Sequence, residues 1–136
     1  IEMVRDLREK LGTAVIWITH DLGVIAGLAD RVLVMYGGQI VEQAQVNELY
    51  ARPQHPYTQG LLESLPRLDE KSEELYSIPG QPPSLYAPPV GCSFAPRCPH
   101  AFDKCLTDNP VLEEIGHEHL VACWWNIDEE RPRHDD

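Results

Sequence analysis

The sequence has few positive charges. Its 136 residues include 11 lysines and arginines against 22 aspartates and glutamates, which gives a formal net charge of −11. A protein that binds nucleic acid needs a basic face to neutralise phosphates, and an anionic membrane surface attracts the same kind of face. The composition therefore argues against nucleic acid as a partner and against direct attachment to a negatively charged membrane.

Long hydrophobic runs are also lacking. A transmembrane helix needs about 20 consecutive apolar residues, whereas the apolar run at residues 14–18 is far shorter. The first five residues, IEMVR, do not have the pattern of a signal peptide. Because the sequence begins inside an apolar helical pattern without a capping residue, we expect that it is cut out of a longer protein.

Helical and strand-like patterns alternate along the first half of the chain. Apolar residues at helical spacing predict a helix over residues 1–11. The continuous apolar run at 14–18 is typical of a strand that is buried on both faces of a parallel sheet. Asp21 is suited to cap a second helix, which begins at Leu22 and has apolar positions as far as Ala29.

A hairpin is predicted next, with strands at 32–36 and 39–43 on either side of the pair Gly37-Gly38. Two short helices are predicted after it, at 46–51 and 58–65. This order is the end of an α/β sheet rather than a complete one, so we expect the partner strands to precede residue 1. The open sheet edge also predicts that the fragment can associate with a second copy of itself.

The composition changes at Pro66, where prolines become dense and exclude helix from much of the following region. We predict a proline-rich linker over 66–90, an irregular four-cysteine module over 91–127 and an acidic tail over 128–136.

His20 is the first candidate functional residue. It directly follows the predicted strand at 14–18 and precedes a predicted helix. Ligands of open α/β sheets bind at the carboxyl ends of the strands, where helix N-termini favour phosphate. An imidazole at this edge can hydrogen-bond a terminal phosphate and stabilise charge as the bond breaks. On spacing alone, the alternative is an ordinary histidine whose hydrogen bonds are satisfied at a strand end.

Two stretches of sequence surround His20: residues 16–25 read IWITHDLGVI and residues 29–42 read ADRVLVMYGGQIVE. The first resembles the switch-histidine region of ABC-type ATPases, and the other is similar to the strand pair that follows it in that family. The resemblance covers residues 1–65. In the family this histidine contacts the γ-phosphate of ATP and helps to align the attacking water. The resemblance therefore implies a catalytic and ATP-binding role for His20, with ATP and Mg²⁺ as cofactors of a full-length subunit.

Other parts of such a nucleotide site do not occur in the sequence. The phosphate loop G-x-x-x-x-G-K-[ST] is absent from the 136 residues. The family's signature motif, its Walker B carboxylates and its catalytic glutamate are absent as well, so Mg²⁺ and the phosphates have no cradle here. We expect that this chain alone hydrolyses no ATP and binds nucleotide weakly at most.

Four cysteines lie in the last third of the chain, with the spacing Cys92-x5-Cys98-x6-Cys105-x17-Cys123. Four thiolates suit either a tetrahedral Zn²⁺ ion or a [4Fe–4S] cluster. Structural zinc sites usually begin with a C-x2-4-C pair and common ferredoxins use C-x2-C, and this spacing has neither. The residues alone leave three possibilities open: an iron–sulfur cluster, zinc, or two disulfides.

The histidines near the cysteines and the tryptophans are not expected to be metal ligands or nucleic-acid contacts. His100, His117 and His119 are better suited to the surface, or to positions behind the ligands, than to replacing a cysteine. Trp17, Trp124 and Trp125 are expected in a core or interface rather than in a platform for nucleic-acid bases, because the chain is too acidic for that role.

Short motifs occur between residues 52 and 124: HPYT at 55–58, IPGQPPSL at 78–85, GCSFAPRCP at 91–99 and HLVAC at 119–123. As a set they resemble the C-terminal extension of ATPases from oligopeptide/dipeptide ABC importers. In that family the four cysteines are associated with a [4Fe–4S] cluster, so the resemblance implies a cluster on all four cysteines, with zinc as the alternative. A module of about 37 residues without a regular apolar pattern can hardly build its own core, which favours a structural role for the metal over a redox role.

The sequence as a whole is interpreted as the C-terminal part of the ATP-binding subunit of a peptide-type ABC importer. The resemblance implies a second ATP-binding subunit and transmembrane permease subunits as partners, at the cytoplasmic face of the membrane. The alternative is an independent, non-enzymatic interaction module that a metal holds together.

Overall fold

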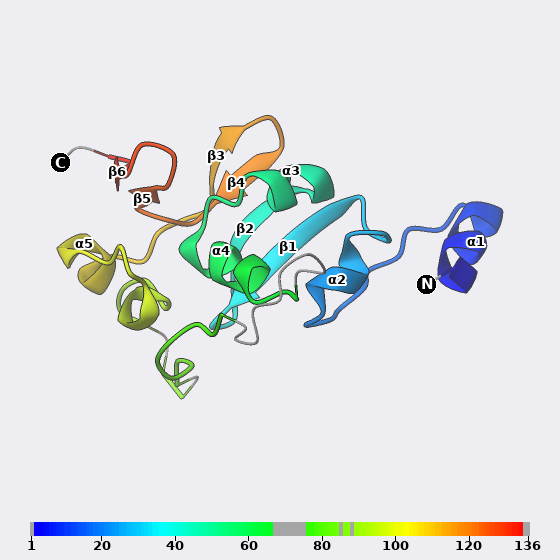
Figure 1. Ribbon diagram of the computed structural model, residues 1–136. Coiled ribbons are helices and arrows are strands. Elements are labelled where there is room, and N and C mark those ends of the chain that lie inside the picture. Colours follow the sequence, from blue (N-terminus) through cyan, green and yellow to red (C-terminus); the bar gives the residue numbers. More distant parts are fainter. Residues whose placement is uncertain (1, 67–75, 85, 88, 135–136) are drawn as a thin grey trace.

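The computed structural model describes residues 2–66, 76–84, 86–87 and 89–134. Figure 1 shows a mixed α/β arrangement in which helices and loops pack around a four-stranded antiparallel sheet, with a separate two-stranded sheet near the C-terminus. The helices are α1 (Glu2–Leu11), α2 (Leu22–Ile25), α3 (Val46–Ala51), α4 (Pro56–Glu63) and α5 (Asp103–Thr107), with one 3-10 turn, η1 (Ala95–Arg97). The strands are β1 (Arg31–Tyr36), β2 (Gln39–Gln45), β3 (Glu113–Gly116), β4 (His119–Val121), β5 (Trp125–Asn126) and β6 (Arg131–Pro132).

The predicted hairpin is confirmed as β1 and β2. Gly37 and Gly38 both have positive φ angles, of 57° and 80°, which side chains disfavour and which a tight hairpin turn requires. The two strands pair antiparallel from Arg31 opposite Gln45 to Tyr36 opposite Gln39. The predicted helices at 46–51 and 58–65 are found as α3 and α4, the second beginning two residues earlier than expected.

The sheet joins two distant parts of the chain. Its strand order is β1-β2-β4-β3, so the second edge of β2 is covered by β4 from the cysteine-bearing region. Glu42 lies opposite Val121, and the Ala122 N–H donates to the Val41 carbonyl at 2.8 Å. The prediction of an irregular module over 91–127 therefore missed regular structure, because β3 and β4 form there and extend the sheet.

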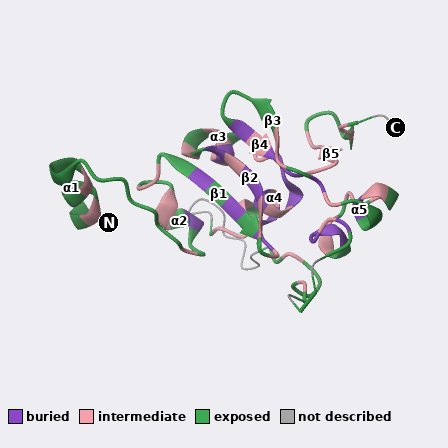
Figure 2. Cartoon of the chain, turned by 180° about the vertical axis from the view of Figure 1, so that it is seen from behind, coloured by how far each residue is buried: buried purple, intermediate pink, exposed green. Residues whose placement is uncertain are grey.

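The hydrophobic core lies on one face of this sheet. Side chains of β1 alternate between exposed and buried, so that Val32, Val34 and Tyr36 point inward (Figure 2). The core is completed from β2, α3 and the cysteine-bearing region, by Val41, Ala44, Leu49 and Phe94. Phe94 is only 2% exposed and packs edge-on against Tyr36, with ring centroids 5.1 Å apart. The cysteine-bearing region thus shares the core of the sheet, in keeping with the small size of a module that would otherwise lack one.

The strand predicted at 14–18 does not form in this structure. These residues belong to no helix or strand, and Ile16 and Ile18 are each 92% exposed. A strand of a parallel sheet needs neighbours that satisfy its backbone groups and cover both of its faces. No described segment pairs with residues 14–18, which explains the difference. The helix after Asp21 is also shorter than predicted, because α2 ends at Ile25 and continues as a turn.

The helix α1 lies at one end of the molecule, apart from the sheet (Figure 1). It has no buried residue. Its contacts run through two arginines. Arg5 donates to the Gly27 carbonyl, and Arg8 bridges Asp30 at 3.2 Å and donates to the Leu28 carbonyl at 3.3 Å. Exposed ion pairs of this kind stabilise a fold by less than about 1 kcal/mol.

The predicted linker over 66–90 is described in part, since residues 67–75, 85 and 88 lie outside the described residues. Within it, Ile78 packs against the core, and the Arg97 guanidinium donates to the carbonyls of Ile78 and Pro79, both at 2.9 Å. None of the helices in the described part of the chain has the length and apolar character that a membrane span requires.

Candidate functional site

His20 lies in an exposed bend just before α2. The following residue, Asp21, caps the helix by accepting the Val24 N–H at 3.3 Å, and the Asp21 N–H donates to the Thr19 hydroxyl at 3.0 Å. These bonds fix the backbone on both sides of His20 and leave the imidazole at the surface. The position at the start of a helix agrees with the prediction, although the buried strand that was expected to precede it is absent from the described structure.

The four cysteines come from four different places in the cysteine-bearing region. Cys92 precedes η1 and Cys98 ends it, Cys105 lies in α5, and Cys123 follows β4. Cys105 is buried and the other three are partly buried. All four are free thiols, so the structure contains none of the disulfides that the spacing left open. In Figure 1, α5, which carries Cys105, and α2, which follows His20, lie on opposite sides of the β1–β2 hairpin.

Gly91 allows two of these segments to come into close contact. A Cβ atom at Gly91 would lie 2.4 Å from the Cys105 carbonyl oxygen and 2.6 Å from the carbonyl carbon of Leu106, both of them backbone atoms. The contact lets the Cys92 N–H donate to the Cys105 carbonyl at 2.8 Å. Sequence reasoning did not single out Gly91, although a glycine directly before a cysteine is a signal of close backbone approach.

One backbone N–H donates to a cysteine sulfur, and further N–H groups lie near two of the others. The Trp125 N–H donates to Cys123 Sγ at 3.4 Å. Burial raises the pKa of Cys98, and the backbone N–H of His100, two residues downstream, offsets part of that rise. The backbone N–H groups of Phe94 and Ala95 offset part of the rise that burial causes in the pKa of Cys92. Hydrogen bonds of this kind favour the thiolate and are typical surroundings of metal-bound sulfur.

Burial opposes that effect. It raises the pKa of Cys98 to about 11 and that of Cys123 to about 12, and it raises the pKa of Cys92 as well. Neighbouring cysteines raise the pKa of each of these three thiols further, which means that the four sulfur atoms share one poorly solvated environment. Thiolates form in such a place when a positive group offsets their charge.

The arrangement does not enclose a single metal ion. A tetrahedral zinc site with Zn–S bonds of about 2.3 Å holds its sulfur atoms roughly 3.8 Å apart. Among residues 2–66, 76–84, 86–87 and 89–134, no three His, Cys, Asp or Glu side chains gather closely enough to hold an ion. The cysteines therefore form a looser group than a preformed zinc site.

Trp124 and Trp125 connect the cysteine segments. The Trp125 ring stacks on the His100 ring, with centroids 5.1 Å apart and planes inclined by 7°. The Trp124 indole N–H donates to the Asp108 carbonyl at 2.9 Å, and the Lys104 ammonium lies 4.7 Å from the centroid of its ring. These two tryptophans are thus interface residues, as the sequence indicates. Trp17 differs from that expectation, because it is 47% exposed in the segment that finds no strand partner.

A buried carboxylate joins β2 to β4. Glu42 is fully buried and accepts three hydrogen bonds: from the Gln54 N–H at 2.6 Å, the His55 N–H at 3.0 Å and His119 Nε2 at 2.7 Å. His119 therefore contacts the sheet rather than the cysteines, while His117 is exposed in the β3–β4 turn. Sequence reasoning missed Glu42, because strand periodicity does not mark a carboxylate as buried.

His55 caps the helix that covers the core. Its Nδ1 accepts the Tyr57 N–H at 3.0 Å at the start of α4, and its Nε2 is buried without a partner among the described residues. Burial, with a smaller contribution from Arg133, lowers the pKa of His55 to about 3. The imidazole is therefore neutral at physiological pH.

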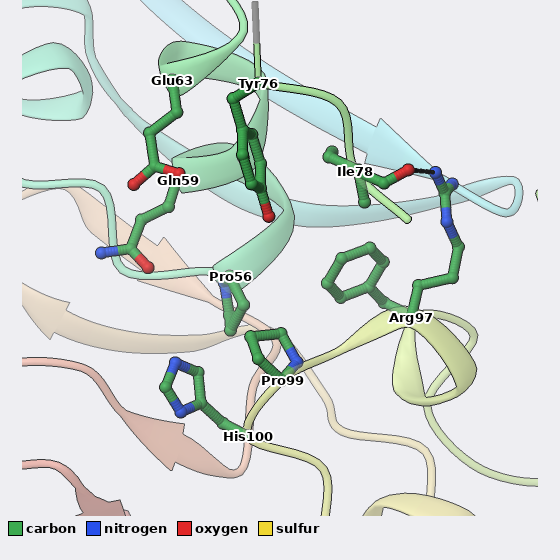
Figure 3. Close-up of a pocket in the computed structure, with 10 residues that line it drawn as sticks. Pro56, Gln59, Glu63, Tyr76, Ile78, Arg97, Pro99 and His100 are labelled. Carbon is green, nitrogen blue, oxygen red and sulfur yellow. Dashed lines mark hydrogen bonds between the residues drawn. The ribbon is translucent and has the colours of Figure 1, made fainter. Parts of the chain in front are cut away.

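The cavity in Figure 3 lies between α4, η1 and the segment around Ile78. Arg97 lines the cavity, but its guanidinium already donates hydrogen bonds to the backbone carbonyls of Ile78 and Pro79. The volume of about 160 Å³ is below the roughly 300 Å³ of the smallest usual ligand sites. This cavity is therefore smaller than the sites that usually hold a peptide or a nucleotide.

Comparison with known proteins gives consistent relatives. Residues 41–105 match the family described as "Oligopeptide/dipeptide transporter, C-terminal region". The protein y4tR of Sinorhizobium fredii, named a probable peptide ABC transporter ATP-binding protein, is 53% identical over 125 residues, which are 91% of this chain and 37% of the relative. The oligopeptide transport ATP-binding protein OppD of Salmonella typhimurium is 45% identical over 127 residues, 93% of this chain and 38% of the relative. AppD of Bacillus subtilis, another oligopeptide transport ATP-binding protein, is 51% identical over 124 residues, with coverage of 91% and 38%. The chain thus spans less than two fifths of the length of these relatives.

Proposed function

Because this chain belongs to the oligopeptide/dipeptide transporter family, we propose that it forms the C-terminal part of the ATP-binding subunit of an ABC importer for peptides or similar small solutes. The observation that carries the proposal is similarity over about nine tenths of the chain, including both the His20 region and the cysteine-bearing region, to proteins named for peptide or oligopeptide transport. The mixed α/β fold with an antiparallel sheet is compatible with that part of an ABC ATPase.

In this proposal His20 contacts the γ-phosphate of ATP and helps to align the attacking water. Its support is the exposed imidazole at the start of α2, where the bonds of Asp21 fix the backbone. A hydrogen-bond donor that stabilises the negative charge of the transition state accelerates phosphoryl transfer. The phosphate loop, the Mg²⁺ ligands and the catalytic base would be contributed by the rest of the full-length subunit.

The proposed partners follow from the same relationship. A second ATP-binding subunit would pair with this one, and both would act on transmembrane permease subunits from the cytoplasmic face of the membrane. ATP and Mg²⁺ would bind only in the full-length subunit, so the 136-residue chain by itself is proposed to be inactive.

The His20 assignment is tested by ATP hydrolysis in the full-length subunit assembled with its partners. We expect His20→Ala to lower the turnover number at least about 100-fold, as for removal of one transition-state donor, while nucleotide still binds. His117→Ala is the matched control, because His117 is equally exposed but lies in the β3–β4 turn. Undiminished hydrolysis by His20→Ala, or ATP turnover by the 136-residue chain, would contradict the proposal.

The cysteines are proposed to hold a [4Fe–4S] cluster through Cys92, Cys98, Cys105 and Cys123. The proposal is supported by four free thiols in one poorly solvated environment and by the Trp125 N–H, which donates to Cys123 Sγ at 3.4 Å. The Trp125 indole Nε1 is also buried without an acceptor among the described residues.

The role proposed for this cluster is structural. When bound, it would supply the positive charge that stabilises four buried thiolates. The thiolates would then tie η1, α5 and the end of β4 together, in a region with few buried apolar residues of its own.

Metal analysis of protein prepared without oxygen tests the cluster. We expect about four irons and four sulfides per chain and absorbance near ~400 nm, all lost when cysteines are replaced by serine. Cys92→Ser and Ser93→Cys form an informative pair, because the second adds a thiol at the neighbouring position without removing a proposed ligand. One zinc per chain without sulfide would refute the cluster and favour the zinc alternative.

An independent, metal-held interaction module is the second candidate function. It is less well supported, because β4 and Phe94 of the cysteine-bearing region complete the sheet and core of the preceding segment. Purification of the native protein would decide: a polypeptide that begins near residue 1 and lacks a phosphate loop would favour the module.

A further inference from the structure

We propose that Tyr50 is a positioning residue for His20, because its hydroxyl ties the rigid helix α3 to the first residue of α2, the helix that begins just after the histidine. The bond joins Tyr50 to Leu22, which is 28 positions away in the chain. The inference rests on the proposed role of His20 in ATP hydrolysis and assigns a part in it to a residue that does not itself contact the nucleotide.

The helix α2 has little structure of its own to hold it in place. It has four residues, whereas isolated helices shorter than about 12 residues are marginal in water. Leu22 is its one buried residue, and Ile25 packs against the edge of the core. The bonds made by Asp21 are local and fix the backbone only within this segment. The placement of α2, and with it that of His20, therefore depends on contacts from other elements.

Tyr50 supplies such a contact. Its hydroxyl donates to the Leu22 carbonyl, two residues after His20, and its side chain packs against the hydrophobic core. Burial raises the pKa of Tyr50, and the nearby charge of Asp21 raises it further. The hydroxyl therefore stays protonated at physiological pH and remains a hydrogen-bond donor.

The helix that carries Tyr50 is firmly attached to the sheet. Leu49, the residue before Tyr50, is fully buried in the core. At the start of α3, the Val46 N–H donates to the Asp30 carbonyl at 3.0 Å. Because α3 is fixed at these points, the bond from Tyr50 restrains α2 relative to the core of the molecule.

The consequence concerns the alignment of the His20 imidazole. A displacement of about 1 Å in a catalytic group can lower a rate on the order of 100-fold. One hydrogen bond typically changes the ratio of aligned to displaced positions by about two- to tenfold. Tyr50→Phe removes this bond and keeps the ring that packs against the core, so it isolates the contribution of the hydroxyl.

The test measures ATP hydrolysis by the full-length subunit assembled with its partners. We expect Tyr50→Phe to lower the turnover number about two- to tenfold and to change the KM for ATP by less than about twofold, since the interaction acts in the transition state. Tyr57→Phe is the matched control, because Tyr57 is also partly buried but contacts Tyr36 and Phe94 instead of α2. A wild-type turnover number in Tyr50→Phe, or an equal decrease in Tyr57→Phe, would overturn the proposal.

A double-mutant cycle separates positioning from a general structural role. If Tyr50 acts through His20, then Tyr50→Phe should lower the turnover number by less than about 1.5-fold when His20 is already replaced by alanine. A decrease as large as the one seen with His20 present would mean that Tyr50 acts independently, and would overturn the proposal.

Hydrogen exchange in the same subunit judges the contact without reference to catalysis. Amides at 22–29 should exchange at least about threefold faster in Tyr50→Phe and at the wild-type rate in Tyr57→Phe. Undiminished hydrolysis by His20→Ala would refute the proposed function of His20, and faster exchange in Tyr50→Phe would still support the tether. Unaltered exchange at 22–29 would overturn the inference even if His20→Ala is inactive.

Discussion

Residues 14–18 and 32–36 are apolar runs of similar composition, but they occupy opposite environments. Ile16 is 92% exposed, whereas Val32 and Val34 are each 5% exposed in the core of the sheet. The difference is a partner: β1 pairs along its length with β2, while no described segment pairs with residues 14–18. Apolar side chains alone therefore do not bury a strand, because its backbone N–H and C=O groups must also be satisfied.

The largest effect on stability is expected for a substitution in the buried strand at residues 32–36. Val34→Asp places a carboxylate in the core without a partner, and we expect it to lower the free energy of unfolding by more than about 4 kcal/mol or to prevent folding. Urea denaturation followed by circular dichroism measures the change. Leu33→Asp is the control on the same strand, since Leu33 is 46% exposed, and a similar loss at both positions would contradict the one-sided burial of β1.

The second prediction concerns the hydrogen bond between Glu42 of β2 and His119 of β4. His119→Ala leaves the buried Glu42 carboxylate with one bond fewer, and we expect a loss of about 3 kcal/mol, as for a broken buried pair. Hydrogen exchange should show the β2 amides becoming less protected, so that β2 begins to resemble residues 14–18. His117→Ala in the adjacent turn should change stability by less than about 0.5 kcal/mol.

A third prediction concerns the contact between the segments of Cys92 and Cys105. Gly91→Ala places a methyl group within 2.4 Å of the Cys105 carbonyl oxygen. Because backbone must move to relieve the overlap, we expect a loss of about 1 to 3 kcal/mol and less bound iron. Gly116→Ala is the control, since its nearest neighbour would be 4.0 Å away. A thermal midpoint equal to that of wild type would show that the segments can separate freely.

Acid should weaken the helix cap beside the core. The pKa of His55 is about 3 in the folded protein because of burial, against about 6.5 in an unfolded chain. Protonation therefore favours the unfolded state, so the stabilisation is complete above pH 6.5 and is lost as pH falls from 6.5 toward 3. The expected slope is about 1.4 kcal/mol per pH unit. His55→Asn keeps a capping residue without titration and should flatten this slope; an unaltered slope would exclude His55 as its source.

The smallest effect on stability is expected for a substitution in the exposed segment at residues 14–18. Ile16→Asp should change the stability of the 136-residue chain by less than about 0.5 kcal/mol, because the side chain is already in water. In the full-length subunit the same substitution should cost several-fold more if the missing partners cover this segment. Equal, small effects in both proteins would mean that residues 14–18 stay exposed.

Sequence reasoning succeeded where partners are close together in the chain. The strands at 32–36 and 39–43 were predictable because Gly37-Gly38 joins them directly. The pairing of β2 with β4 was not predictable, since 77 residues separate Glu42 from His119 and no local periodicity encodes such a contact. The burial predicted for 14–18 depended on neighbours that the described structure does not supply.

The sequence predicted some features of the candidate sites and not others. His20 was singled out by its place before a helix, and the structure places it before α2 at the surface. The spacing of the cysteines left three chemistries open, and a resemblance at residues 91–99 narrowed them. The His100–Trp125 stack could not be foreseen, because it depends on two segments that meet only in three dimensions.

The distant pairing of β2 with β4 also has a consequence for protein synthesis. A ribosome adds about 5 to 20 residues per second, so the 77 residues between Glu42 and His119 take about 4 to 15 s to follow. During that interval the nascent hairpin has an unpaired strand edge, which is a template for pairing with another chain. We expect the nascent protein to depend on chaperones over this interval and to become independent of them once β4 has emerged.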